Sequence, residues 1–119
     1  YIPLAYIEHM ELAYAAADFV VCRSGAMTVA EVTAVGLPAC YVPLAHGNGE
    51  QSLNARPVVD AGGGLMISDA QFTAEKFIAD VLPLVDNAPL LGAMAGISKS
   101  LGLPNAAGLL ADIVEKAGA

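Results

Sequence analysis

The sequence has no tryptophan, few basic residues, only two cysteines and no long uninterrupted apolar run. Five Lys and Arg against twelve Asp and Glu give a net charge of −7, which argues against a nucleic-acid-binding surface or a polybasic lipid patch. No stretch approaches the roughly 20 apolar residues of a membrane-spanning helix, because Asp18, Arg23 and Glu31 interrupt the most apolar region. Any membrane contact is therefore expected to be peripheral.

The two cysteines, Cys22 and Cys40, each lie within a short apolar run. Two cysteines without metal-like spacing indicate neither a zinc site nor a disulfide framework. We therefore expect reduced, packed thiols in a cytosolic protein, and no bound metal or cofactor. The alternative interpretation, Cys22 as a nucleophile, is disfavoured because buried thiols are usually inert.

What the chain does contain is enough apolar material for one compact domain, since 56% of its 119 residues are hydrophobic. Short apolar runs alternate with helical patterns, which predicts an α/β fold with a Rossmann-like parallel sheet of three or four short strands. Strands are expected at residues 18–22, 39–44 and 65–67. Helices are expected at 9–17, from about 26 to a stop at Gly36, at 50–61 and 73–85, from 87 or 88 to 101, and at 105–117. The chain begins with Tyr1 and shows no signal-peptide pattern, so we expect a piece of a longer protein.

The most informative stretch is the junction at residues 19–32. An apolar run predicts a strand ending at Cys22, Gly25 allows the backbone to turn, and apolar residues with helical spacing follow. The first N–H groups of a helix have no partner within the helix and lie at the positive end of its dipole. This junction can therefore bind an anion such as a diphosphate.

Thr28 and Glu31 allow two interpretations of this junction. Residues three apart lie on one helix face about a turn from each other, so a diphosphate at Thr28 would place an attached ribose near the Glu31 carboxylate. Alternatively, the two residues form a capping box that satisfies the helix end itself. Without further context the capping box is favoured, and no GxGxxG motif is present to decide.

A second polar group is expected at the same edge of the sheet, because the carboxyl ends of parallel strands meet there. Glu50, Gln51 and Asn54 share one face at the start of a helix and can bind the hydroxyls of a sugar. Alternatively, Glu50 only favours the positive helix end and the amides contact water, which is the preferred interpretation for Asn54 alone. His46 is a candidate catalytic base, although a solvated loop histidine is the favoured interpretation.

Four motifs occur in order along this part of the chain: Arg23-Ser24-Gly25-Ala26-Met27-Thr28-Val29-Ala30-Glu31, Gly36-Leu37-Pro38-Ala39, Val42-Pro43 and Gln51-x-x-Asn54-Ala55. Together they resemble the carboxyl-terminal domain of the MurG family. These bacterial enzymes transfer N-acetylglucosamine from UDP-GlcNAc to the undecaprenyl-pyrophosphoryl-muramyl-pentapeptide lipid in peptidoglycan synthesis. The resemblance implies that residues 1–119 are part of the donor-binding domain of a two-domain GT-B glycosyltransferase, without its amino-terminal acceptor domain.

The resemblance also implies which residues bind UDP-GlcNAc: Ile7, Arg23, Ser24, Gly25, Ala26, Met27, Thr28, Glu31, Glu50, Gln51 and Asn54. Ile7 follows a strand in the family and would contact the uracil ring through its backbone, whereas Gln51 matches a glutamine that contacts the donor sugar. Glu50 departs from family members that carry a second glutamine, but an acidic residue followed by glutamine occurs in other transferases of this architecture. The catalytic base is expected from the absent domain, so the isolated chain is expected to be inactive.

The expected partners are UDP-GlcNAc and, through the absent domain, the lipid-linked muramyl-pentapeptide and the cytoplasmic face of the bacterial membrane. Three alternatives stay open. The chain belongs to another UDP-sugar enzyme of this fold, such as a UDP-GlcNAc 2-epimerase or a glycolipid transferase, or it is a non-catalytic donor-binding subunit, or it is a packing fragment that binds nothing. Residues 62–119 show no motif with an evident chemical role.

Overall fold

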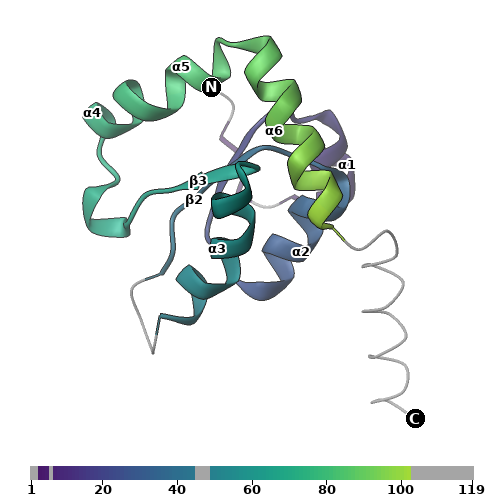
Figure 1. Ribbon diagram of the computed structural model, residues 1–119. Helices are drawn as coiled ribbons and strands as arrows, with labels where there is room; N and C mark the ends of the chain where they lie inside the picture. The colour runs from purple at the N-terminus through teal and green to yellow at the C-terminus, as the bar shows by residue number, and fades with distance from the viewer. Residues whose placement is uncertain (1–2, 6, 45–48, 103–119) are drawn as a thin grey trace.

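The computed structural model describes residues 3–5, 7–44 and 49–102 (Figure 1). The elements in chain order are α1 (Met10–Ala16), β1 (Val20–Cys22), α2 (Ala26–Val35), β2 (Ala39–Tyr41), α3 (Glu50–Ala61), β3 (Gly64–Met66), the 3-10 turn η1 (Asp69–Gln71), α4 (Ala74–Lys76), the π-helical segment η2 (Phe77–Val81), α5 (Leu82–Val85) and α6 (Ala88–Leu101). This alternation confirms the expected α/β class.

The three strands form one parallel sheet in the order β1-β2-β3. Val20 is paired with Ala39, and Ala39 with Gly64, so all three strands run in register toward the same edge. Since each strand is followed by a helix, the connections at the carboxyl ends of the strands gather at that edge, where ligands bind in open parallel sheets. The three expected strands are confirmed: β1 and β2 are shorter than predicted, and β3 begins one residue earlier than predicted.

Alternate strand residues are buried in two cores on opposite faces of the sheet. One face places Ala39 and Tyr41 against α2 and α3, which contribute Val32 and Val58. The other face has its own cluster, formed by Cys40, Val42, Ile67 and Val81 with Phe19, Leu65, Phe72 and Phe77 at its margin. Figure 1 shows the corresponding layers, with α2, α3 and α6 grouped together and the α4–α5 segment arching away from them.

Glycines end both helices that lead away from the site, as expected. Gly36 follows α2 with φ 83° and Gly62 follows α3 with φ 94°, a left-handed conformation that residues with a Cβ rarely adopt. The N–H of Gly36 donates to the carbonyl of Val32 at 3.0 Å, which satisfies part of the helix end. Each helix therefore stops where the next strand has to begin.

The second half of the chain confirms the expected helices, with one difference. The Thr73 side chain accepts a hydrogen bond from the N–H of Lys76, and the Asn87 side chain accepts one from the N–H of Leu90, so both segments have an amino-terminal side-chain cap. The helix predicted from residue 73 to 85 contains the π-helical segment η2, which the apolar pattern did not indicate. The helix predicted at residues 105–117 lies outside the described residues.

Two further observations concern membrane spans and the start of the chain. Within the described ranges, no single helix is both long and apolar enough to cross a membrane. The segments Ala74–Val85 and Ala88–Leu101 meet that test only as a pair, which is bent by 89°. The strand that the family resemblance implies before Ile7 is not among the strands assigned to the described residues.

Candidate functional site

The N-cap of α2 is not the residue that the capping box requires, which is Thr28. Gly25 is the N-cap, with extended backbone angles (φ −61°, ψ 152°), and its carbonyl accepts the first helical hydrogen bond from Val29 at 3.0 Å. Thr28 is therefore the third residue of the helix, and no side chain caps this end. The capping-box interpretation of Thr28 and Glu31 is wrong because the chain enters the helix three residues earlier than that motif requires.

The amides at this helix end are available to a ligand. Among the described residues, none accepts a hydrogen bond from the N–H of Gly25, Ala26, Met27 or Thr28. Ala26 is exposed and the Met27 side chain is 60% exposed, so packing does not close the helix end. Unpartnered N–H groups at the positive end of a ten-residue helix are able to bind an anion.

Ser24 ties this helix end to α3. Its side chain is fully buried, and its hydroxyl donates to the carbonyl oxygen of Gln51 at 2.7 Å. The Asn54 side-chain amide in turn donates to the carbonyl of Ser24 at 3.1 Å. Asn54 is thus not simply solvated, because it holds the turn before α2 against the first turns of α3.

The Gln51 side chain is oriented by two backbone donors. Its Oε1 accepts from the N–H of Leu44 at 2.8 Å and from the N–H of Ser24 at 3.4 Å. Because both partners are donors, the oxygen faces the protein, and the side-chain nitrogen retains its hydrogens for another acceptor. Gln51 thereby links the loop after β2 to the turn after β1, and it can still donate to a ligand.

Arg23 is engaged with two groups at the carboxyl edge. Its Nη1 forms an ion pair with Asp69 Oδ1 at 2.6 Å and also donates to the carbonyl of Val42 at 3.4 Å. Asp69 was not among the residues predicted for the site. It lies just beyond β3 in the run Ile67-Ser68-Asp69, so the rule that strand ends share one edge would have identified it.

Glu31 is half-buried one turn into α2 and faces Tyr14 of α1. Burial raises the pKa of Tyr14, and the nearby Glu31 carboxylate raises this pKa further. Sequence reasoning missed Tyr14, since the contact depends on how α1 packs against α2.

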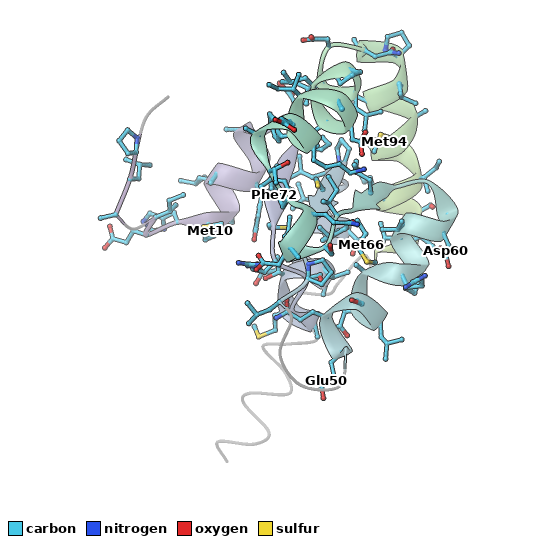
Figure 2. The ribbon with its side chains drawn as sticks, turned by 90° about the vertical axis from the view of Figure 1, so that its left-hand side faces the viewer. Met10, Glu50, Asp60, Met66, Phe72 and Met94 are labelled. Atoms are coloured by element: carbon cyan, nitrogen blue, oxygen red, sulfur yellow. The ribbon has the colours of Figure 1, made fainter. Side chains whose placement is uncertain are left out.

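The remaining predicted residues are less closely grouped. Glu50 lies exposed at the amino end of α3, and Figure 2 shows it pointing away from the body of the chain, at the opposite end of the helix from Asp60. Ile7 precedes α1 and is 37% exposed. His46 lies outside the described residues.

Both cysteines are free, as expected. Burial, together with the nearby Cys40 thiol, raises the pKa of Cys22 to about 11, and burial with the nearby Asp80 carboxylate raises the pKa of Cys40 to about 11. Burial likewise raises the pKa of the Tyr41 phenol. Thiols of such high pKa are almost entirely protonated at neutral pH, which disfavours Cys22 as a nucleophile.

A cavity of about 310 Å³ opens at the same carboxyl edge, between the segments that follow β2 and β3. Its lining includes Pro43, Leu44, Ser52, Ser68 and Asp69. A second cavity of about 320 Å³ lies between α2 and α3, with Ala26 and Asn54 at its wall. The free helix amides therefore lie beside concave surface at the edge of a parallel sheet, an arrangement typical of nucleotide-binding α/β domains.

Comparison with known families agrees with this class of α/β domain and identifies one family within it. Residues 1–110 match the glycosyltransferase family 28 C-terminal domain, and the chain belongs to that family. A solved structure that is similar is that of MurG from Acinetobacter baumannii. It is 33% identical, with a TM-score of 0.79, over 95% of this chain and 33% of that one.

Curated relatives are named UDP-N-acetylglucosamine-N-acetylmuramyl-(pentapeptide) pyrophosphoryl-undecaprenol N-acetylglucosamine transferase. The protein from Mycolicibacterium paratuberculosis is 59% identical over 107 residues, which cover 90% of this chain and 26% of the relative. That from Acidothermus cellulolyticus is 53% identical over the whole chain and 32% of the relative. The chain thus spans about a quarter to a third of the length of these proteins.

Proposed function

We propose that this chain is the donor-binding part of an inverting transferase that moves N-acetylglucosamine from UDP-GlcNAc to undecaprenyl-pyrophosphoryl-muramyl-pentapeptide. The observation that supports it most directly is the open amino end of α2, where the amides of residues 25–28 have no partner among the described residues. The names of the relatives supply the donor and the acceptor. Residues outside this chain would bind the acceptor at the cytoplasmic face of the membrane.

The chemistry assigns a limited role to this chain. The acceptor hydroxyl attacks C1 of the sugar and loses a proton, while the bond from C1 to the diphosphate breaks and UDP leaves. Fixed N–H groups at the start of α2 would stabilise the negative charge that develops on the diphosphate. Glu31 would accept hydrogen bonds from the ribose hydroxyls, and the Gln51 side-chain nitrogen would donate to the sugar. The base would come from the acceptor domain.

Titration calorimetry of residues 1–119 with UDP-GlcNAc, UDP and ADP tests the proposal. We expect UDP-GlcNAc and UDP to bind and ADP to bind more weakly, because the uracil contact is lost. An absence of UDP binding at millimolar concentration would contradict the proposal. A preference for UDP-glucose or UDP-galactose over UDP-GlcNAc would instead indicate another UDP-sugar enzyme.

A transferase assay with the lipid-linked acceptor tests the division of roles. The isolated chain is expected to show no turnover, since neither the base nor the acceptor-binding surface is expected within it. Turnover by residues 1–119 alone would show that the chemistry is complete in this chain.

A further inference from the structure

Arg23 joins the carboxyl ends of all three strands. It follows β1 directly and donates through Nη1 to the carbonyl of Val42, the first residue after β2, at 3.4 Å. The same nitrogen pairs at 2.6 Å with Asp69, which lies in η1 just after β3. The guanidinium therefore extends from the first strand past the second to the third, and we call this set of contacts the Arg23 bridge.

In the Arg23 bridge, the guanidinium that was expected to bind the donor is already paired with Asp69. We infer that Arg23 is a positioning residue, which acts with Asp69 to hold the turn before α2, and that it is not a ligand of the diphosphate. The inference rests on the proposed function, because it concerns how the donor site is held. Asp69 thereby becomes a determinant of donor binding, although it does not touch the donor.

The bridge is placed to have this effect. Ser24 and Gly25, the two residues after Arg23, lead directly into the free amides of α2, and Ser24 is fully buried. Because only Ser24 and Gly25 separate Arg23 from α2, a displacement of the Arg23 backbone would also displace the amides at the start of α2. Gln51 holds Ser24 in place from the side of α3. The Arg23 bridge and the hydrogen bond from Ser24 to Gln51 therefore hold the turn before α2 from two sides.

The effect of Asp69→Asn on the affinity for UDP-GlcNAc has opposite directions for a positioning role of Arg23 and for direct binding. If Arg23 bound the diphosphate, Asp69→Asn would free the guanidinium and remove a nearby negative charge, so UDP-GlcNAc would bind more tightly. If Arg23 positions the turn, Asp69→Asn releases the bridge, and affinity falls despite the removal of that charge. Both side chains are about half exposed, so the effect should diminish at high salt.

The test compares Asp69→Asn, Arg23→Gln and the double variant by calorimetry with UDP-GlcNAc. We expect each single variant to bind about three- to tenfold more weakly, and the double variant to lose less than the two single losses combined. The matched control is Asp80→Asn, which breaks the Lys76–Asp80 pair of similar length (2.7 Å) and exposure away from the site. Unchanged or tighter binding by Asp69→Asn would overturn the inference.

Amide hydrogen exchange gives a second readout that requires no ligand. The N–H of Val42, bonded at 2.8 Å, and that of Ile67, bonded at 3.0 Å, close the sheet beside the bridge. Both should exchange faster in Asp69→Asn and Arg23→Gln, while the N–H of Val20 at the other end of the sheet keeps its rate. If the wild-type chain binds no UDP-GlcNAc, the proposed function fails. Faster exchange in Asp69→Asn and Arg23→Gln would still support the bridge, and unchanged exchange in both variants would overturn it.

Discussion

The hydroxyl of Ser24 donates to the carbonyl oxygen of Gln51 at 2.7 Å, and this bond connects the turn before α2 to the first turn of α3. Through it, two segments separated by 27 positions in the sequence are held together at one edge of the sheet. The site is therefore a property of the packed edge and not of either loop alone.

Removal of that hydroxyl should loosen the edge. Ser24→Ala takes away one hydrogen bond of a fully buried group, so we expect the free energy of unfolding to fall by about 1 kcal/mol and UDP affinity to decrease. Urea denaturation and calorimetry measure the two effects. Ser100→Ala is the control, since Ser100 is exposed and bonds only the carbonyl of Ile97 in its own helix. An equal loss of UDP affinity in the control would contradict the role of Ser24.

Gln51 should contribute to sugar recognition through its nitrogen. Gln51→Glu keeps an oxygen for the N–H of Leu44 but removes the side-chain donor. We expect UDP-GlcNAc to bind about tenfold more weakly, with UDP affected less, because UDP lacks the sugar. Competition assays with both ligands measure the difference. Equal losses for the two would show that Gln51 acts on the nucleotide or on the fold.

Ala26→Pro isolates one amide of the proposed anion site. Proline is favoured at the first position of a helix, where the N–H has no helical partner, and Gly25 already has the extended backbone that a residue before proline requires. We therefore expect unchanged thermal stability and weaker UDP binding. A variant that binds UDP as tightly as the wild type would exclude the Ala26 N–H as a ligand.

The thiols should make stability fall at alkaline pH. Their pKa is about 11 in the folded state for both Cys22 and Cys40, against 9.0 for an ordinary thiol, so the unfolded chain loses these protons first. Stability from this source is complete below about pH 9 and is lost as pH rises toward about 11. Urea unfolding across that range should show the decline, with a shallower slope in Cys22→Ala. A pH-independent free energy of unfolding would contradict the assigned burial.

Much of the fold could be predicted because local signals agree with the tertiary structure. The apolar runs gave the strands, and Gly36 and Gly62 marked the ends of α2 and α3 through the left-handed backbone that they adopt. The start of α2 at Ala26 was also expected, but the Thr28-x-x-Glu31 pattern suggested a competing cap. That pattern describes side chains able to cap, whereas the backbone decides which residue is the N-cap.

The contacts that define the site were harder to predict, since they join distant segments. The strand-end rule could have placed Asp69 at the edge, but its pairing with Arg23 depends on how the strand ends pack. The proximity of Glu31 to Tyr14 likewise depends on how two helices pack, which no local pattern encodes. The π-helical segment η2 was missed for a related reason: its apolar spacing also fits an α-helix. Sequence reasoning thus named candidate residues that carry motifs and did not name the residues that contact them.

The most direct test of the account is to follow the backbone N–H resonances of residues 25–28 by NMR during titration of the chain with UDP. We predict that the signals of Ala26, Met27 and Thr28 shift saturably with UDP and less with uridine, which lacks the diphosphate. Saturable UDP binding that leaves these three amides unmoved would contradict the central claim that the amino end of α2 holds the diphosphate.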